Sequence, residues 1–194
     1  MFGRDAIEAL KTRDFTTVLD VGAGTGAAGH IFASWGKDVT SSDIVDKGAP
    51  NLVEGDFMYA GFGHSFDLIW ASHVLEHQLN VNAFLQKCRS LQEPGGLICI
   101  TVPPLKHDIV GGHVTLWNAG LVMYNLILAG YNCTDCSIKQ YGYNISVIAK
   151  ADNFTLPALH YDYGDIEKLS PWFPPGYNYQ GFNGSIQEFN WPGT

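Results

Sequence analysis

A short apolar run that contains an acid and opens into alternating glycines constrains the fold more than any other part of this sequence. The run is Val18–Val21, Asp20 lies within it, and glycines follow at positions 22, 24 and 26. A run of this length that stops at glycine is typical of a buried parallel strand entering a tight turn. Glycine adopts positive φ and leaves its backbone open to close approach, and the helix that follows begins with unpaired N–H groups. We therefore expect a nucleotide-like ligand at this turn.

Segments with strand-like and helix-like patterns alternate along the chain. Strands are expected at residues 38–43, 51–55, 66–71 and 97–102, and helices at 2–12, 27–35, 80–91 and 116–129. Two later strands, 136–141 and 144–149, flank Gly142 closely enough to be antiparallel neighbours. The alternation predicts an α/β protein with a doubly wound, mostly parallel sheet.

The composition describes an ordered globular chain with an acidic balance. Of 194 residues, 46% are hydrophobic and 15% are charged, which is ordinary for one folded domain. The net charge of -8 disfavours long-range attraction to nucleic acid or to an anionic membrane surface. Residues 116–129 are too few to span a bilayer, and the N-terminal residues lack the apolar core of a secretory signal. We expect a cytoplasmic protein with no membrane partner and no nucleic-acid partner.

The chain changes character at residue 152, after which proline, glycine, asparagine and aromatic residues dominate. We expect residues 1–151 to form the ligand-binding domain. Residues 152–194 should form an irregular extension packed on the same domain, because the aromatic content is too high for a solvated tail. Cys133 and Cys136 form an isolated Cys-x-x-Cys pair, which we interpret as structural thiols.

The glycine turn also matches the sequence pattern of dinucleotide-binding sites. Gly24, Gly26 and Gly29 satisfy the G-x-G-x-x-G pattern of dinucleotide-binding proteins, and Asp43 lies at the distance expected for a ribose contact. An NAD-dependent dehydrogenase is therefore one alternative. Against it, the Asp20 carboxylate would meet a pyrophosphate of the same charge. Asp56, after the third expected strand, is placed to accept a hydrogen bond from an adenine amino group.

Two further segments of the sequence belong with the glycine turn and the acids Asp43 and Asp56. Besides VLDVGAGTG, Asp43 and Asp56, the chain contains the segments FDLIWASHVLEH and LQEPGGLICITVPP. Together they resemble the class I S-adenosylmethionine-dependent methyltransferases, especially the enzymes that act on small molecules. The resemblance covers residues 16–150. It implies a Rossmann-like sheet of seven strands in the order 3-2-1-4-5-7-6, with strand 7 antiparallel. It also implies S-adenosylmethionine as cofactor and S-adenosylhomocysteine as product.

The resemblance assigns roles to individual residues. Asp20 and the glycine turn would line the methionine and ribose side of the cofactor. Asp43 would hold the ribose hydroxyls, and Asp56 would meet the adenine amino group. The full set of cofactor residues implied in this way is Asp20, Gly22, Ala23, Gly24, Gly26, Asp43, Ile44, Asp56, Phe57, Ser72 and His73.

Histidines after the fourth and fifth expected strands are the candidates for catalysis. The methyl group of a sulfonium is already activated, so a general base is needed only where the acceptor must lose a proton. We assign His77 and His113 as catalytic candidates, and we expect His113 and Trp117 to face the acceptor. The expected function is transfer of a methyl group to oxygen or nitrogen of a small molecule.

Other interpretations of this histidine-rich segment remain open. Residues 73–77 match the H-x-x-E-H string of inverted zinc proteases, but they leave a strand of a nucleotide-binding sheet rather than lie on a protease helix. The small-RNA 2′-O-methyltransferases, which are similar, hold a divalent cation with this segment and a later histidine. Glu76, His77 and His113 would supply part of such a site, but His73 stands where those enzymes have an acid, so we assign no metal ligand. A cofactor-binding module without catalysis is the last alternative.

Overall fold

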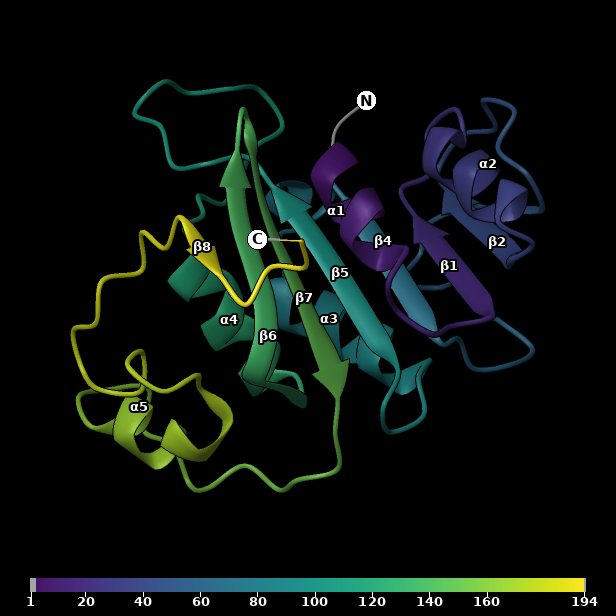
Figure 1. The fold of residues 1–194 in the computed structure, drawn as a ribbon. Helices are drawn as coiled ribbons and strands as arrows, with labels where there is room; N and C mark the ends of the chain where they lie inside the picture. The colour runs from purple at the N-terminus through teal and green to yellow at the C-terminus, as the bar shows by residue number, and fades with distance from the viewer. Residues whose placement is uncertain (1–2, 194) are drawn as a thin grey trace.

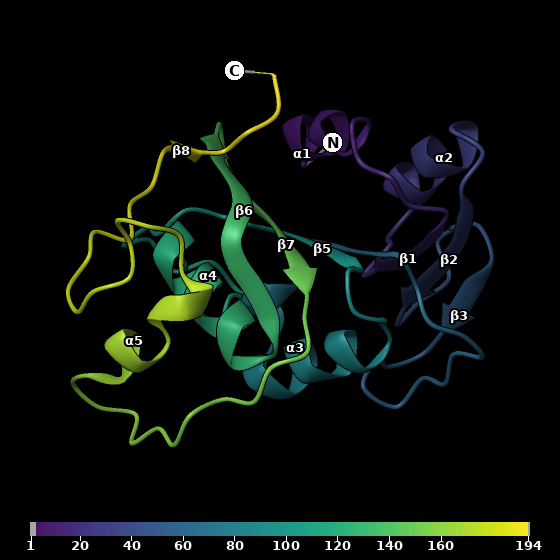
Figure 2. The same cartoon turned by 60° about the horizontal axis from the view of Figure 1, so that its bottom comes forward.

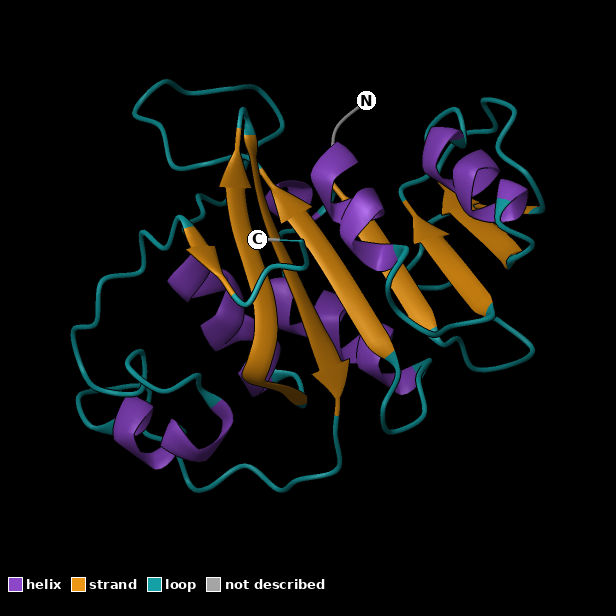
Figure 3. Ribbon diagram, in the orientation of Figure 1, coloured by secondary structure: helices purple, strands orange, loops and turns teal. Residues whose placement is uncertain are grey.

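The computed structural model describes residues 3–193 and contains one eight-stranded sheet (Figure 1, Figure 3). The strands are β1 (Thr17–Val21), β2 (Asp38–Asp43), β3 (Leu52–Glu54), β4 (Leu68–Ser72), β5 (Leu97–Val102), β6 (Tyr131–Tyr141), β7 (Asn144–Ala151) and β8 (Glu188–Phe189). Their order is β3-β2-β1-β4-β5-β7-β6-β8, with β1 to β5 parallel and β7 antiparallel to both of its neighbours. The predicted order is confirmed, and β8 extends it by one strand.

Helices cover both faces of the sheet, as Figure 2 shows. On one face lie α1 (Arg4–Leu10) and α2 (Ala27–Ser34), and on the other lie α3 (Val81–Ser90) and α4 (Ala119–Leu128). Shorter helical segments are η1 (Leu75–His77), α5 (Asp165–Lys168) and η2 (Ser170–Trp172). Within residues 3–193, no helix combines the length and the apolar character that crossing a bilayer requires.

Side chains of the central strand β4 alternate between two hydrophobic cores. Leu68 and Trp70 pack in the core with α1 and α2, whereas Ile69 and Ala71 pack in the core with α3 and α4. This period of two follows from strand geometry, and coverage of both faces explains why four successive residues, Leu68 to Ala71, are all apolar. Packing on both sides therefore fixes where β4 places the residues that follow it.

Two elements begin at positions other than those predicted. α4 begins at Ala119 rather than at 116, because Asn118 is its N-cap and accepts a hydrogen bond from Leu121 N at 2.8 Å. β6 begins at Tyr131 rather than at 136, and its register against β7 is interrupted between Asn132 and Ser137. Such an irregularity disrupts the alternation by which a strand is recognised in a sequence. The cysteines at 133 and 136 lie inside β6 as buried free thiols.

The segment after β7 is not irregular throughout. β8 pairs with β6, with Phe189 opposite Ile138, and α5 and η2 form two short turns of helix. Phe173 is buried in the core shared with α4, and Trp191 is buried in the core shared with α1. Coverage of apolar surface is therefore the main role of these aromatic side chains. The domain boundary at residue 151 stays a prediction.

Candidate functional site

The carboxyl ends of the parallel strands border a cavity of about 370 Å³. The predicted residues on its wall are Gly22, Asp43, Ile44, Asp56, Phe57, His73 and His77. Val21, Ser42, Gly55, Val74, Gln78 and Phe84 also line it and were not predicted. These segments are distant in sequence but meet here, because parallel strands deliver their carboxyl ends to the same edge of the sheet.

The glycine loop between β1 and α2 is fixed to the end of β2 by hydrogen bonds. Gly22 N and Ala23 N donate to Ser42 O at 2.8 and 3.1 Å. Gly24 N donates to the Asp43 carboxylate, with 2.7 Å between N and Oδ2. Hydrogen bonds therefore hold the glycine loop and the Asp43 side chain in a fixed position relative to each other.

Two glycines of this loop satisfy both a conformational and a steric requirement. Gly22 and Gly26 have φ of 68° and 73°, in the left-handed region that favours glycine. A Cβ atom on Gly22 would overlap the side chain of Val74, and one on Gly26 would overlap Pro50. Any larger residue at these positions would move the loop away from the cavity wall.

Asp43 and Asp56 carry carboxylates whose orientation is set by backbone donors. Asp43 Oδ1 accepts a hydrogen bond from Val45 N at 3.2 Å, in addition to the bond from the glycine loop. Asp56 Oδ1 accepts from Met58 N at 2.9 Å. Each carboxylate oxygen has two lone pairs, so both side chains keep acceptor capacity. They are suited to bind hydroxyl or amino groups of a ligand in the cavity.

Asp20 lies beneath the glycine loop and is not on the cavity wall. Its Oδ2 accepts a hydrogen bond from Gly29 N, in the first turn of α2, at 3.1 Å. The N-cap of α2 is Gly26, which has no side chain, so Asp20 supplies the capping oxygen from β1. Burial raises the pKa of Asp20 to about 7; the hydrogen bond from Gly29 opposes this shift, and the charge of Asp43 adds to it.

Four further residues assigned to the cofactor do not line the cavity. They are Ala23, Gly24, Gly26 and Ser72. The three loop residues act through the backbone conformation and hydrogen bonds of the loop, and the Ser72 hydroxyl is buried. Their direct contact with a cofactor, like that of Asp20, stays a prediction.

His73 follows β4 and has a φ of 58°, which is uncommon for a residue other than glycine. Its Nδ1 lies 3.1 Å from Glu76 Oε1, and its Nε2 lies 3.0 Å from Asn144 Oδ1. Both ring nitrogens thus face oxygen acceptors, an arrangement that favours the protonated imidazolium. Burial lowers the pKa of His73, but the contacts with Glu76 and Asn144 outweigh burial, so the pKa is raised.

His77 and His113 meet beside the buried side chain of Glu76. His77 Nδ1 lies 2.7 Å from Gly112 O, and because a carbonyl only accepts, the Nδ1–H of His77 is the donor. The two imidazole rings are 5.0 Å apart at an interplanar angle of 85°. Glu76, His77 and His113 each offer one ligand atom, and these atoms lie within 4.8 Å of one another. The cluster has the composition of a metal-binding site.

A second cavity, of about 180 Å³, is formed largely by the segment that joins β5 to α4. Both predicted acceptor residues, His113 and Trp117, line it. Trp117 is only 3% exposed, and its Nε1 donates to Thr115 Oγ1 at 2.9 Å, so most of its ring packs in the core. Tyr143 lines the same cavity and was not predicted. The predicted hairpin around Gly142 already contained this signal, because antiparallel pairing with β5 brings the hairpin tip to the carboxyl edge.

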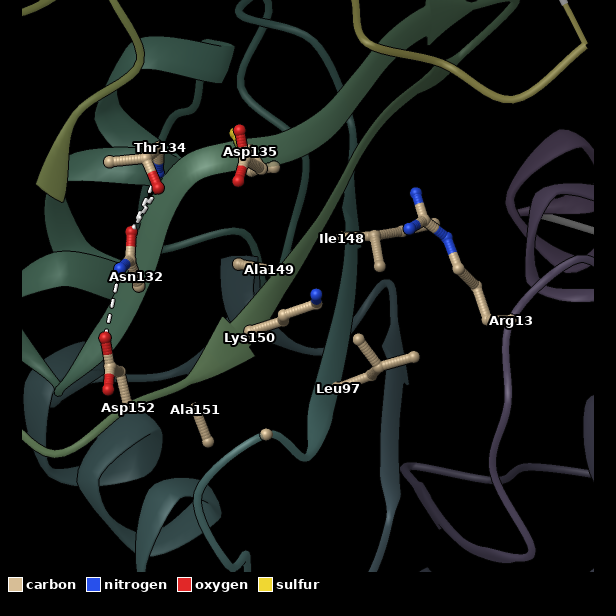
Figure 4. Close-up of a pocket in the computed structure, with 12 residues that line it drawn as sticks. Arg13, Leu97, Asn132, Thr134, Asp135, Ile148, Ala149, Lys150, Ala151 and Asp152 are labelled. Carbon is tan, nitrogen blue, oxygen red and sulfur yellow. Dashed lines mark hydrogen bonds between the residues drawn. The ribbon is translucent and has the colours of Figure 1, made fainter.

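A third cavity, of about 250 Å³, lies at the opposite edge of the sheet (Figure 4). Leu97, at the start of β5, lines it together with Arg13 and residues 148–152 of β7 and its end. On its wall, Asn132 Nδ2 donates to Asp152 Oδ2 at 3.0 Å. None of the predicted site residues lines this cavity. The candidate functional site is therefore the cavity at the carboxyl edge, where open α/β sheets bind their ligands.

Known methyltransferases resemble this chain in sequence. A family model described as a methyltransferase domain matches residues 4–128. A ubiquinone biosynthesis O-methyltransferase from Mesorhizobium japonicum is 26% identical over 134 residues, which cover 59% of this chain and 53% of that protein. Another, from Rhizobium rhizogenes, is 31% identical over 114 residues, which cover 51% and 45% respectively. The chain thus spans about half the length of the curated relatives it matches.

Solved structures share the fold. The 1,6-didemethyltoxoflavin-N1-methyltransferase of Burkholderia thailandensis, with 1,6-didemethyltoxoflavin and S-adenosylhomocysteine bound, superposes with a TM-score of 0.65 at 18% identity, covering 77% of this chain and 76% of that chain. An S-adenosylmethionine-dependent methyltransferase from Archaeoglobus fulgidus gives 0.65 at 18% identity, covering 76% and 90%. The family match includes the glycine loop, Asp43, Asp56 and the H-x-x-E-H segment. As its sequence motifs predicted, this chain belongs to the methyltransferase domain family.

Proposed function

We propose that this chain transfers a methyl group from S-adenosylmethionine to an oxygen or nitrogen atom of a small molecule. The observation that carries the proposal is the pair of carboxylates, Asp43 and Asp56, on the wall of one cavity beside the glycine loop. The volume of this cavity, about 370 Å³, falls within the range of roughly 300–1,000 Å³ that is typical of small-molecule sites. The family match over residues 4–128 supports the same chemistry.

The residues on the cavity wall fit an adenosyl group. Asp43 offers two carboxylate oxygens, which suit the two neighbouring hydroxyls of a ribose, and Asp56 suits an exocyclic amine. Ile44 is 71% exposed, which leaves an apolar side chain free to pack on the face of an adenine ring. The backbone of Gly22 lies open on the same wall. When bound, the cofactor supplies a methyl group on a sulfonium, so the protein has to position the acceptor and exclude water.

The acceptor is proposed to bind where the two cavities adjoin, between His77 on the wall of one and His113 on the wall of the other. Because the Nδ1–H of His77 is committed to Gly112 O, its Nε2 carries the lone pair and can accept a proton from a hydroxyl or amine. The printed names of similar proteins describe both an O-methyltransferase and an N1-methyltransferase. The net charge of -8 argues against a nucleic-acid acceptor.

Parallel calorimetric titrations with S-adenosylhomocysteine, NAD and ATP test the cofactor. We expect saturable binding of S-adenosylhomocysteine alone. Asp43→Asn should weaken it about 10- to 100-fold, because a hydrogen bond to a charged group contributes about 1.5–3 kcal/mol. Asp46→Asn, in the exposed turn after β2, is the matched control and should bind as the wild type does. Binding of NAD in place of S-adenosylhomocysteine would refute the proposal in favour of a dehydrogenase.

A screen of small phenols, catechols and amines with a labelled methyl donor tests the transfer itself. Incorporation of label into one of them is the expected result. If S-adenosylhomocysteine binds but no acceptor in a broad screen is labelled, the chain is a cofactor-binding module and the proposed transfer is wrong.

A further inference from the structure

We propose that the cavity of about 250 Å³ at the amino end of β5 is a second binding site, and that its ligand is a small amino acid (Figure 4). Among residues 3–193, none lines both this cavity and the one proposed for the cofactor. Its volume is below the range of roughly 300–1,000 Å³ that is typical of drug-sized ligands, so it suits a smaller molecule. Binding here does not depend on the proposed methyl transfer.

The half-buried guanidinium of Arg13, on one side of the cavity, lacks an anionic partner. Its Nη2 donates to Ser137 Oγ at 2.8 Å, which is the only hydrogen bond of this side chain within the described part of the chain. Its Nε is buried without a hydrogen-bond partner, and no carboxylate of residues 3–193 lies within ion-pair distance. Arginine has five N–H donors, and a partly buried charge is costly unless it is paired. An anion in the cavity would supply the missing partner.

Lys150 brings a second positive charge to the same cavity. Its side chain is exposed, and its ammonium has no ion-pair or hydrogen-bond partner among the described residues. Because side chains alternate along a strand, Lys150 lies on the same face of β7 as Ile148, which packs in the core with α1. Ile148 pairs with Ser137, the hydrogen-bond partner of Arg13. Two residues of a strand span about 7 Å, so one small ligand can reach both cations.

The two cations converge on one space. Figure 4 shows the charged ends of Arg13 and Lys150 pointing toward one another from two sides of the cavity. Like charges that face each other repel, and an anion between them removes this cost. A carboxylate suits the position, because its two oxygens match the planar fork of a guanidinium and also accept from an ammonium.

Asp135 places one unpaired negative charge on the same wall. It lies in the irregular part of β6, where the register against β7 shifts, and such an irregularity redirects side chains. Asp135 O accepts from Asn190 Nδ2 at 2.9 Å, and Ser137 Oγ donates to Asn190 O at 2.7 Å. The C-terminal extension therefore holds this part of β6 in place. Within residues 3–193, the Asp135 carboxylate has no hydrogen-bond or ion-pair partner.

This arrangement of charges indicates the class of ligand. A carboxylate would bind between Arg13 and Lys150, and an ammonium group of the same molecule would bind to Asp135. Asp152, also on the wall, already accepts two hydrogen bonds, from side-chain and backbone donors. Inorganic phosphate would meet the like charge of Asp135, whereas a zwitterion matches all three groups. Leu97 adds apolar surface, which suits a short apolar side chain.

The test is a titration of the ¹⁵N-labelled full chain with L-alanine and L-leucine, followed by two-dimensional NMR. We expect saturable shifts of the amides of residues 132–136 and 148–152, and none at residues 43–57 around the proposed cofactor cavity. Two analogues of L-leucine separate its charges: 4-methylpentanoate lacks the amine, and 3-methylbutylamine lacks the carboxylate. Each should bind at least tenfold more weakly than L-leucine, since each leaves one charged group of the cavity unpaired.

Three substitutions test the charged residues of the cavity. Arg13→Gln, Lys150→Gln and Asp135→Asn should each weaken binding of L-leucine at least tenfold, because each removes a charge-assisted contact. Lys47→Gln, in an exposed turn, is the matched control and should bind L-leucine as the wild type does. Circular dichroism checks that Arg13→Gln folds. If it does not, the two exposed positions, 135 and 150, decide the question.

Four results would overturn the proposal. They are the absence of saturable shifts with both amino acids, shifts confined to the cofactor cavity, tighter binding of inorganic phosphate than of L-leucine, and unchanged L-leucine binding in the folded variants. S-adenosylhomocysteine is titrated into the same samples. Binding of S-adenosylhomocysteine without either amino acid would refute only the second site. Binding of an amino acid without S-adenosylhomocysteine would refute only the proposed cofactor.

Discussion

The free energy of unfolding of Asp20→Asn, relative to the wild type, should be higher at pH 8 than at pH 5. The Asp20 side chain is buried, and its pKa is raised from 3.8 to about 7, chiefly by burial. The folded state therefore holds a proton that the unfolded state releases once the pH exceeds 3.8. This proton's contribution to stability is complete below pH 3.8 and is lost as the pH rises to about 7. Asparagine keeps an oxygen for Gly29 N–H but does not ionise.

The size of the effect follows from the pKa shift. A shift of about 3 pH units corresponds to about 4 kcal/mol of folding free energy when Asp20 is ionised in both states. At pH 5 only about 1.5 kcal/mol of this has been lost, so the advantage of Asp20→Asn should grow by about 2.5 kcal/mol between pH 5 and pH 8. The new amide leaves an N–H₂ group to satisfy, which costs about 1–3 kcal/mol. That cost is the same at both pH values and cancels in the comparison.

Urea denaturation followed by circular dichroism, at pH 5 and pH 8, measures this double difference. Asp14→Asn is the control, since Asp14 is an exposed acid and its replacement should shift stability by less than about 0.5 kcal/mol at either pH. If the difference between Asp20→Asn and the wild type is equal at the two pH values, Asp20 ionises normally in the folded protein. The raised pKa attributed to the burial of Asp20 would then be wrong.

Three further substitutions test the loop, the second cavity and the C-terminal extension. Gly22→Ala should cost about 1–3 kcal/mol, because its φ is 68° and its Cβ would overlap Val74, and adding Val74→Ala should recover part of this loss in urea denaturation. Unchanged stability of Gly22→Ala would contradict the steric argument. Trp117→Ala should cost about 3–5 kcal/mol, because the ring is buried, whereas a side chain that only faces the acceptor would raise KM and leave stability unchanged. Phe173→Ala should cost a similar amount, while exposed Tyr179→Ala should cost less than about 0.5 kcal/mol; equal small effects would mean that the extension is not part of the core.

The strand order of the main sheet was predicted through the resemblance to the class I methyltransferases, whereas the residue pattern located the individual strands, most clearly the apolar runs of β1, β4 and β5. The structure contradicts only the starts of α4 and β6 by several residues. β8 was not predictable, since two residues such as Glu188 and Phe189 carry no periodic pattern. Its pairing depends on the free edge that β6 offers, which only the assembled sheet defines.

The place of a site residue could be predicted where it is set by the end of a parallel strand. The direction in which a side chain points could not. Asp43 ends β2 and Asp56 follows the end of β3, its parallel neighbour, so both were expected at one edge of the sheet. Asp20 lies one residue before the end of β1, and its carboxyl group accepts from Gly29 N at the start of α2, where the N-cap Gly26 has no side chain. The proximity of His113 to Glu76 was suggested only by the likeness to the small-RNA 2′-O-methyltransferases, because the backbone hydrogen bonds that tie the loop to Glu76 have no sequence pattern.

Because the side chains of β4 alternate between two cores, a change in the number of its residues would disrupt packing more than a substitution would. Deleting one residue before Leu68 and Trp70 would be absorbed by the preceding loop, but a deletion inside the strand would exchange its two faces. The residues between the deletion and the end of β4 would then point to the opposite face, and His73, which follows directly, would leave its contacts with Glu76 and Asn144. Different apolar side chains could therefore fill β4, but the number of residues from Leu68 to His73 is fixed by the alternation of the strand.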